Sequence, residues 1–266
     1  MIRKSLCLAA LIITACSQES PEAEAPTKAT AAPPRVAAPA PAQAAPAKAR
    51  LVEERNDLLE FTYGWPAEAA AIPKLNAQFE EALAERRAEA VATAREDKAA
   101  RDKDAPYNSH YYTQVWETFG SNPLLLSLAS EIGTFTGGAH GNATYSAMLW
   151  YKSADRRIET KELFGNPAGA FKAMTQSYCA ELDKQRAEKR GEELPLEGAD
   201  WMVECPPLAE QVIVPVDGNK DGKFELLRVL IGPYGAGPYA EGTYEVDLPV
   251  TPAIRGLLKP EFAGAF

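Results

Sequence analysis

Histidine and cysteine, on which many catalytic and metal sites depend, are scarce in this sequence. Two histidines, His110 and His140, occur among 266 residues, and the four cysteines contain no CxxC spacing. A zinc centre needs more nitrogen or sulfur ligands than two separated histidines offer, and no GxSxG-type nucleophile elbow is present. We recognise no catalytic constellation in the sequence, and we therefore expect a protein that is not an enzyme.

Positive charge is also in deficit. The chain has 28 Lys and Arg against 37 Asp and Glu, which gives a net charge of −9. An acidic surface disfavours binding to nucleic acid and to anionic lipid, because both are polyanions. We therefore expect no nucleic-acid partner, and any charged protein partner should be basic.

A long apolar run is missing as well. The run at residues 6–15 has about ten residues, against the roughly 20 of a membrane-spanning helix, and two cations precede it. These features are typical of a secretory signal peptide. The run ends in Ile13–Cys16, which resembles the lipobox of bacterial lipoproteins, where the Cys thiol is diacylated and the signal is cut before it. We therefore predict a lipoprotein signal peptide at residues 1–15 and lipidation of Cys16.

Lipidation would decide where the protein resides. Two or three acyl chains on Cys16 supply the multiple signals that stable membrane attachment needs. Residue 17 is Ser and not Asp, which by resemblance to Gram-negative sorting favours the outer membrane, on its periplasmic side. Removal of residues 1–15 takes away two cations and no acid, so the mature charge would be −11. An ordinary cleavage site that happens to contain a cysteine is the alternative.

Residues 16–50 are predicted to be a disordered tether. Prolines recur among many alanines, and no aromatic residue is present. Such a segment cannot bury enough apolar area to offset the entropy of ordering it. Proline favours extended stretches, so the tether would hold the following domain away from the membrane.

The remainder of the chain predicts an α+β fold with mixed or antiparallel sheets and two long helices. We divide it into an N-terminal subdomain, 51–155, and a C-terminal subdomain, 156–266. The expected long helices cover residues 74–101 and 167–190. The expected strands cover residues 57–63, 110–119, 124–135, 142–151, 211–216, 224–231 and 244–248.

Two cysteines remain once the signal peptide and the lipidated residue are set aside. Cys179 and Cys205 form an even pair in an oxidising compartment, which favours a disulfide. Metal binding by these two residues is the less favoured alternative.

Two segments carry a family resemblance. The first is Phe135-Thr-Gly-Gly-Ala-His-Gly-Asn142, and the second is the Pro-Tyr-Gly-rich segment 232–244. Together they resemble the extracytoplasmic region shared by the anti-sigma factor RsiV and the N-terminal part of the peptidoglycan deacetylase PdaC. The order of strands and helices agrees with that region over roughly residues 50–262. The resemblance implies a region of unknown function, which in RsiV is associated with lysozyme binding.

The departures from those proteins limit what the resemblance implies. We expect a cleaved signal peptide and the tether before the domain, whereas an anti-sigma factor needs a cytoplasmic part and a membrane span. The deacetylase activity requires a separate catalytic domain with paired histidines, and His110 and His140 are 30 residues apart. The resemblance therefore implies a sensor or binding role without sigma-factor control or deacetylation.

The turn that contains His140 has two readings. In the structural reading Gly137 and Gly138 adopt positive φ, Gly141 completes the motif, and His140 forms a hydrogen bond that holds the turn. In the catalytic reading, His140 is the base of a hydrolase that acts on the cell wall. We favour the structural reading, because a nucleophilic mechanism needs an activated Ser or Cys beside the base.

Two further sets of residues are candidates for binding. Oxygen ligands at positions 1, 3, 5 and 9 of an acidic loop match the front of a calcium loop; they are Asp217, Asn219, Asp221 and Glu225. Arg228 stands where a calcium-binding EF-hand has its bidentate Glu, so a polar hairpin tip made of turn residues is the alternative. No other cofactor is expected. Three tyrosines could offer flat faces to a sugar or a protein, although core packing is commoner; they are Tyr234, Tyr239 and Tyr244. The sequence thus favours a membrane-anchored sensor or binding lipoprotein for a cationic muramidase of the lysozyme type or for peptidoglycan.

The lipobox gives the first prediction. Cys16→Ser should release the protein from the membrane fraction or block its processing, because the acyl acceptor is lost. Membrane fractionation and mass spectrometry of the N-terminal peptide test this. Unchanged membrane association without an acyl mass would contradict it.

Overall fold

A computed structural model describes residues 47–102, 104–191 and 200–266 of the chain. The predicted signal peptide, Cys16 and the predicted tether up to residue 46 lie outside the described residues. In the described part of the chain, no helix is both long and apolar enough to cross a membrane.

The first sheet has seven strands and mixed pairing. Its path runs β1-β2-β3-β5-β6-β7, and β4 pairs with β5 beside it. β2 and β3 are parallel, and the other pairs are antiparallel. The strands are β1 (Arg50–Arg55), β2 (Leu59–Trp65), β3 (His110–Val115), β4 (Glu117–Ser121), β5 (Leu125–Phe135), β6 (Asn142–Tyr151) and β7 (Arg156–Ile158).

The long helix α2 (Pro73–Ala100) packs on β2 and β3 and links these parallel strands. Leu75, Phe79 and Leu83 are buried at a spacing of four residues, so they lie on one face of the helix. Pro73 begins the helix, where its missing N–H costs no hydrogen bond. Beyond Leu83 only Ala94 of this helix is buried, so the second half of α2 runs over the surface.

The second sheet has three antiparallel strands in the order β10-β9-β8. They are β8 (Val212–Val216), β9 (Leu226–Ile231) and β10 (Tyr244–Pro249). Helix α3 (Pro167–Arg190) packs along β10. The Asn166 side chain caps the helix by accepting from the Gly169 N–H, and Gly191 ends it with φ +70°.

The shorter helices connect these elements. The α-helical turns are α1 (Ala67–Ala70), α4 (Asp200–Val203), α5 (Pro252–Arg255) and α6 (Pro260–Ala263). The 3-10 turns are η1 (Lys152–Ala154), η2 (Thr160–Leu163), η3 (Leu208–Glu210) and η4 (Tyr239–Glu241).

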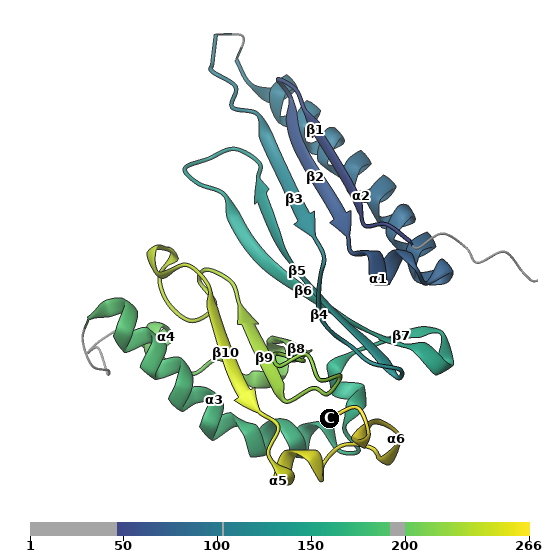
Figure 1. The fold of residues 1–266 in the computed structure, drawn as a ribbon. Helices are drawn as coiled ribbons and strands as arrows, with labels where there is room; N and C mark the ends of the chain where they lie inside the picture. The colour runs from purple at the N-terminus through teal and green to yellow at the C-terminus, as the bar shows by residue number, and fades with distance from the viewer. Residues whose placement is uncertain (1–46, 103, 192–199) are drawn as a thin grey trace, which may run out of the picture. The chain divides into compact units, whose positions relative to one another are not determined.

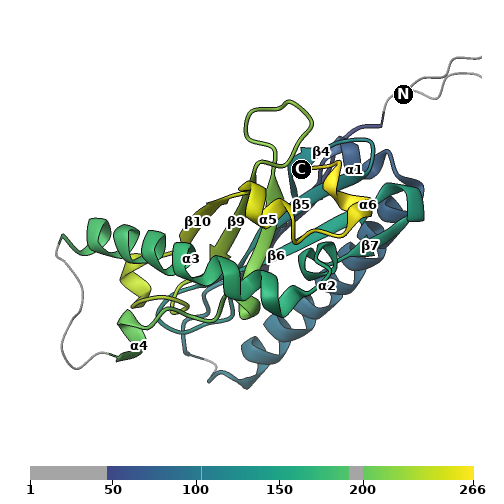
Figure 2. The same ribbon diagram turned by 90° about the horizontal axis from the view of Figure 1, so that it is seen from below.

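The two sheets pack face to face, with a long helix on each outer side (Figures 1 and 2). Ala129 of β5 shares a buried cluster with Val214 and Val216 of β8 and with Leu230 of β9. On the far side of the second sheet, Met174, Tyr178 and Leu182 of α3 enter the largest core cluster. The predicted α+β class, with two long helices and mixed sheets, is therefore confirmed.

Apart from shifts of one or two residues at strand ends, the strands differ from the prediction in three places. The expected single strand at 110–119 is two strands, because Trp116 turns into the core against Phe79 (ring centroids 5.4 Å apart) and separates β3 from β4. β1 was not expected, and it begins at Arg50 within the segment assigned to the tether. The three-residue strand β7 was also missed.

The predicted disulfide is present. Cys179 of α3 is bonded to Cys205, and their Cα atoms are 5.5 Å apart. The bridge closes a loop of 26 residues in sequence separation, so it fastens the segment after α4 to the middle of α3.

The disulfide gives a stability prediction. The double variant Cys179→Ala with Cys205→Ala should lower the free energy of unfolding by about 3–4 kcal/mol, because the open chain gains entropy in the unfolded state. Urea unfolding of the oxidised protein and of the double variant measures the difference. Reduction of the natural protein should reproduce the shift and leave the variant unchanged. Equal midpoints for all samples would contradict the prediction.

Candidate functional site

The two segments that carry the resemblance meet in the folded chain. The turn between β5 and β6 contains His140, and the loop between β9 and β10 contains Tyr234 and Tyr239 (Figure 1). The His140 ring stacks on Tyr239, with centroids 3.8 Å apart and planes inclined by 21°. The two tyrosine rings lie 5.5 Å apart. We call His140, Tyr234 and Tyr239 the aromatic cluster.

Glycines shape the turn that presents His140. Gly137 and Gly138 both have φ +96°, a conformation that costs free energy in residues with a Cβ. A Cβ on Gly141 would overlap the Tyr111 hydroxyl of β3. The turn therefore needs glycine for backbone conformation at two positions and for space at the third.

His140 is held by the turn and by the tyrosine loop. Its Nδ1 donates to the Gly141 carbonyl at 2.8 Å, and the Tyr239 hydroxyl donates to the same carbonyl at 2.9 Å. Its Nε2 lies 3.4 Å from the Tyr234 hydroxyl. Within the described residues no carboxylate, Ser or Cys is hydrogen-bonded to His140. These contacts match the structural reading and supply no partner for the catalytic one.

Tyr234 is the more exposed of the two tyrosines in the aromatic cluster. Its side chain is 54% exposed, and its backbone has φ +67°. A tyrosine in the left-handed region carries strain of about 1–3 kcal/mol, and such strain is concentrated at functional sites. The loop thus holds a large aromatic ring in water at a conformational cost.

The prediction that Tyr244 contacts a ligand is wrong, because this side chain is buried. It is 2% exposed at the start of β10, and its hydroxyl donates to Glu241. Burial, followed by the bond to Glu241, raises the pKa of Tyr244 to about 12. It is a core tyrosine whose hydroxyl is satisfied, which is the alternative that the sequence left open.

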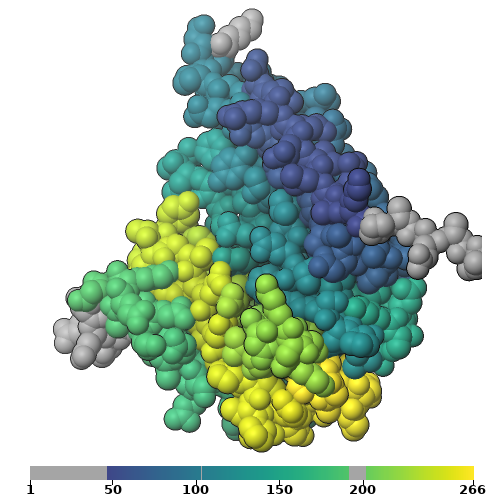
Figure 3. All heavy atoms as spheres, in the orientation of Figure 1, coloured from purple at the N-terminus to yellow at the C-terminus, as the bar shows by residue number. Residues whose placement is uncertain are grey.

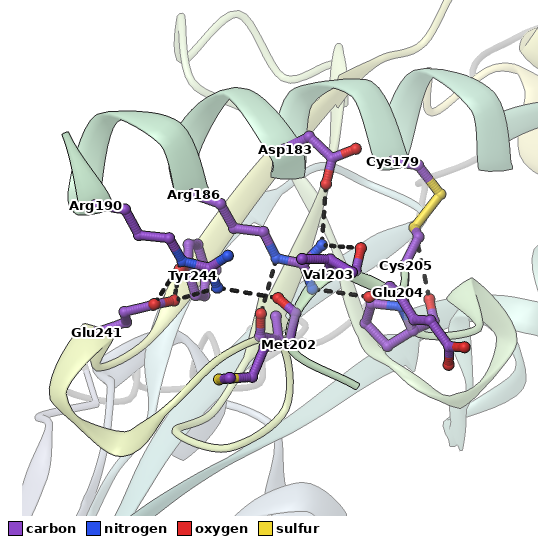
Figure 4. A network of polar contacts seen from close by, with 12 residues as sticks. Cys179, Asp183, Arg186, Arg190, Met202, Val203, Glu204, Cys205, Glu241 and Tyr244 are labelled. Carbon is purple, nitrogen blue, oxygen red and sulfur yellow. Dashed lines mark hydrogen bonds and ion pairs between the residues drawn. A yellow bond between two sulfur atoms is a disulfide. The ribbon is translucent and has the colours of Figure 1, made fainter. Parts of the chain in front are cut away.

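A buried arginine fixes the tyrosine loop to α3. Arg186 is 0% exposed, and its guanidinium donates to the carbonyls of Ala236, Val203 and Glu204 at 2.8, 3.0 and 2.8 Å. It also donates to the Asp183 carboxylate at 2.9 Å. Figure 4 shows Arg186 between α3 and the segment that follows α4. Ala236 lies between the two tyrosines of the aromatic cluster, so this network sets the position of their loop.

A second ion pair holds the end of the same loop. Arg190 donates to both carboxylate oxygens of Glu241, at 2.6 and 3.0 Å, and to the Met202 carbonyl (Figure 4). Burial opposes the ionisation of Glu241, yet the bonds from Arg190 and Tyr244 lower its pKa. Lys189 donates to the carbonyls of Glu241 and Thr243. In the space-filling view the yellow C-terminal part of the chain lies at the surface beside green α3 (Figure 3).

The side-chain oxygens of the acidic loop accept hydrogen bonds from the backbone of the same loop. Asp217 accepts from the N–H groups of Asp221 and Gly222, and Glu225 accepts from those of Gly218 and Asn219. Asn219 and Asp221 make similar local bonds. In the part of the chain that the structure describes, no three His, Cys, Asp or Glu side chains are placed to hold a metal. The arrangement matches the hairpin tip, and the calcium site stays a sequence prediction.

A cavity that the sequence did not reveal lies between α2 and the first sheet. Its volume is about 550 Å³, and aromatic side chains line it, among them Tyr63, Phe79, Tyr112 and Trp116. His110 also lines the cavity. It is hydrogen-bonded to Asp97 of α2, with its Nε2 3.0 Å from the carboxylate. The alternation of aromatic residues along β2 and β3 was the one sequence signal that pointed to this cavity. It does not show that α2 leaves part of the sheet uncovered.

Comparison with known proteins agrees with this arrangement. Residues 52–143, which include the His140 turn, match the family model described as "Deacetylase PdaC". A DUF3298 family protein from Pseudomonas aeruginosa PAO1 has the same fold, with 16% identity, a TM-score of 0.50, and coverage of 82% of this chain and 96% of that chain. A DUF3298 family member from Bacteroides fragilis NCTC 9343 has 16% identity, a TM-score of 0.46, and coverage of 82% and 95%. A search of curated proteins found no match. The resemblance to a PdaC- and RsiV-like domain is therefore confirmed, and this domain type is of unknown function.

The arginine network gives the third prediction. Arg186→Met should lower the free energy of unfolding by about 3–5 kcal/mol, because it leaves buried carbonyls and a carboxylate without their donor. Urea unfolding measures the loss. Lys184→Met is the matched control, since Lys184 is an exposed residue on the same helix and forms a weak pair with Glu181. Equal effects of the two variants would contradict the role assigned to Arg186.

Proposed function

We propose that this protein is a membrane-anchored periplasmic binding lipoprotein whose aromatic cluster is the contact surface. The observation that carries the proposal is the exposed Tyr234 ring, which is 54% exposed on a loop that a buried arginine fastens to α3. Aromatic rings that are held rigidly before binding lose little conformational entropy on association. Tyrosine is also enriched among the residues that dominate protein interfaces.

The proposed ligand is a cationic muramidase of the lysozyme type. The resemblance to the RsiV sensor region supports this class of partner, and the mature charge of −11 suits a basic protein. Opposite net charges speed encounter, and salt weakens this effect because screening acts over about 8 Å at physiological ionic strength. Charge alone gives salt-sensitive association, so the aromatic cluster must supply contacts that persist at raised salt.

Peptidoglycan fragments are the second candidate ligand, because a sugar ring can stack on the same exposed aromatic rings. The His140–Tyr239 stack and the neighbouring Tyr234 present three aromatic faces within one small area. A glycan ligand carries little of the positive charge that a muramidase carries. The two ligands are therefore distinguished by the salt dependence of binding.

Titration calorimetry of the full-length chain with lysozyme, at low and at high salt, tests the proposal. Binding at both salts is expected, and Tyr234→Ala should weaken it at least about tenfold, as for an interface anchor. Leu51→Ala is the control, since Leu51 has a similar exposure of 51% on β1. Heat with peptidoglycan fragments but not with lysozyme would favour the second candidate. No heat with either ligand would end both candidates, and equal binding to any cationic protein would end the muramidase candidate.

A further inference from the structure

The edge of β6 is open along part of its length. β7 pairs with β6 only at Leu149–Tyr151. The Lys152 N–H donates to the Leu124 carbonyl. This bond shows which residues of β6 direct their backbone groups toward β5 and which direct them away. In an antiparallel ladder every second residue directs both backbone groups to the partner strand, so Tyr145 and Ala147 direct theirs away from β5. Among the described residues, no strand pairs with β6 at these two positions.

The open stretch is bounded at both ends. At one end Gly232 lies so close that a Cβ there would be 2.7 Å from the Ala143 carbonyl oxygen. At the other end β7 occupies the edge from Leu149 onward. A strand added to β6 between these limits has space for about five residues at roughly 3.3 Å each, and its course must stop where β7 begins.

Two other strand edges, those of β8 and β1, are protected. The outer carbonyls of β8 accept from side chains, Ile213 from Thr160 and Pro215 from Ser127. β1 carries charged residues that form ion pairs with β2 and α2, as edge strands commonly do. The β6 edge has neither form of protection at Tyr145.

A cationic side chain, that of Arg157, lies where the open edge ends. The Arg157 guanidinium donates to the Ala147 carbonyl at 3.3 Å, and the side chain is exposed. In the described part of the chain no carboxylate lies within ion-pair distance of Arg157, whereas its neighbour Arg156 is paired with Glu162 at 3.2 Å. Arg157 is therefore placed to receive a carboxylate at the end of an added strand.

Cavities lie on both sides of the open edge. The aromatic cavity between α2 and the first sheet and a second cavity of about 310 Å³ both include Ser146, Met148 and Arg157 in their walls. Side chains of an added strand point alternately to the two faces of a sheet. One set would enter the aromatic cavity, where apolar side chains fit, and the other set would enter the second cavity.

We propose that the C-terminal peptide of a partner protein adds to the β6 edge as a parallel strand, with its terminal carboxylate on Arg157. The added strand must end where β7 begins, so the C-terminus of a chain fits this position better than a chain that continues. The backbone groups of Tyr145 and the N–H of Ala147 supply hydrogen bonds independent of sequence, and the two cavities select side chains. This site is separate from the aromatic cluster and does not depend on muramidase binding.

The probe is an equimolar library of N-acetylated hexapeptides with free C-termini, offered to the full-length chain beside the same library as C-terminal amides. Mass spectrometry of bound peptides should show enrichment of the free acids over the amides, with an apolar residue at one or more alternate positions. Arg157→Gln should lower the affinity of the enriched peptide about tenfold, as for a lost charge-assisted hydrogen bond. Arg156→Gln should not, and thermal unfolding verifies that both variants fold.

Amide hydrogen exchange distinguishes strand addition from side-chain binding. The enriched peptide should slow exchange at Tyr145 and Ala147, and this protection should weaken in Arg157→Gln at the same peptide concentration. No enrichment in either library, equal enrichment of acids and amides, or binding without protection at these two amides would overturn the proposal.

Discussion

The burial of the Arg186 guanidinium is the constraint on which the C-terminal half of the structure depends. A guanidinium cannot be deprotonated in a protein, so every donor that leaves water needs an acceptor. Arg186 finds them in three carbonyls and one carboxylate. Two of those carbonyls belong to the segment that the disulfide also fastens to α3, and the third belongs to the tyrosine loop. Irregular backbone thereby acquires a fixed position relative to a helix.

The aromatic cluster combines pieces that are distant in sequence. His140 and Tyr234 are 94 residues apart, yet their side chains lie 3.4 Å from each other at the nearest polar atoms. The packing of the second sheet on β5 and β6 brings the end of β9 beside the β5–β6 turn. The glycines of the turn then allow close approach to Tyr111 and Tyr239. The site is therefore a product of sheet packing and of local backbone conformation together.

Local pattern predicted the elements well and their long-range partners poorly. The four-residue spacing of Leu75, Phe79 and Leu83 predicts α2, and the parity and compartment of Cys179 and Cys205 predict their bond. The sequence also singled out both segments of the aromatic cluster. It did not show that Arg186 is buried, because an arginine on an amphipathic helix is usually exposed. It left open whether Tyr244 lies in the core. β1 and β7 were missed since a short charged strand at a sheet edge has little apolar alternation.

Main-chain carbonyls, not side chains, receive most of the hydrogen bonds of Arg186. The arginine therefore constrains the length and path of the tyrosine loop, while the side chains along that path are left free to diverge. Lineages with this fold can thus retune the loop's contact residues by single substitutions, much as an antibody framework tolerates variation in its binding loops. An insertion or deletion near Ala236 would meet stronger purifying selection than a substitution at Tyr234.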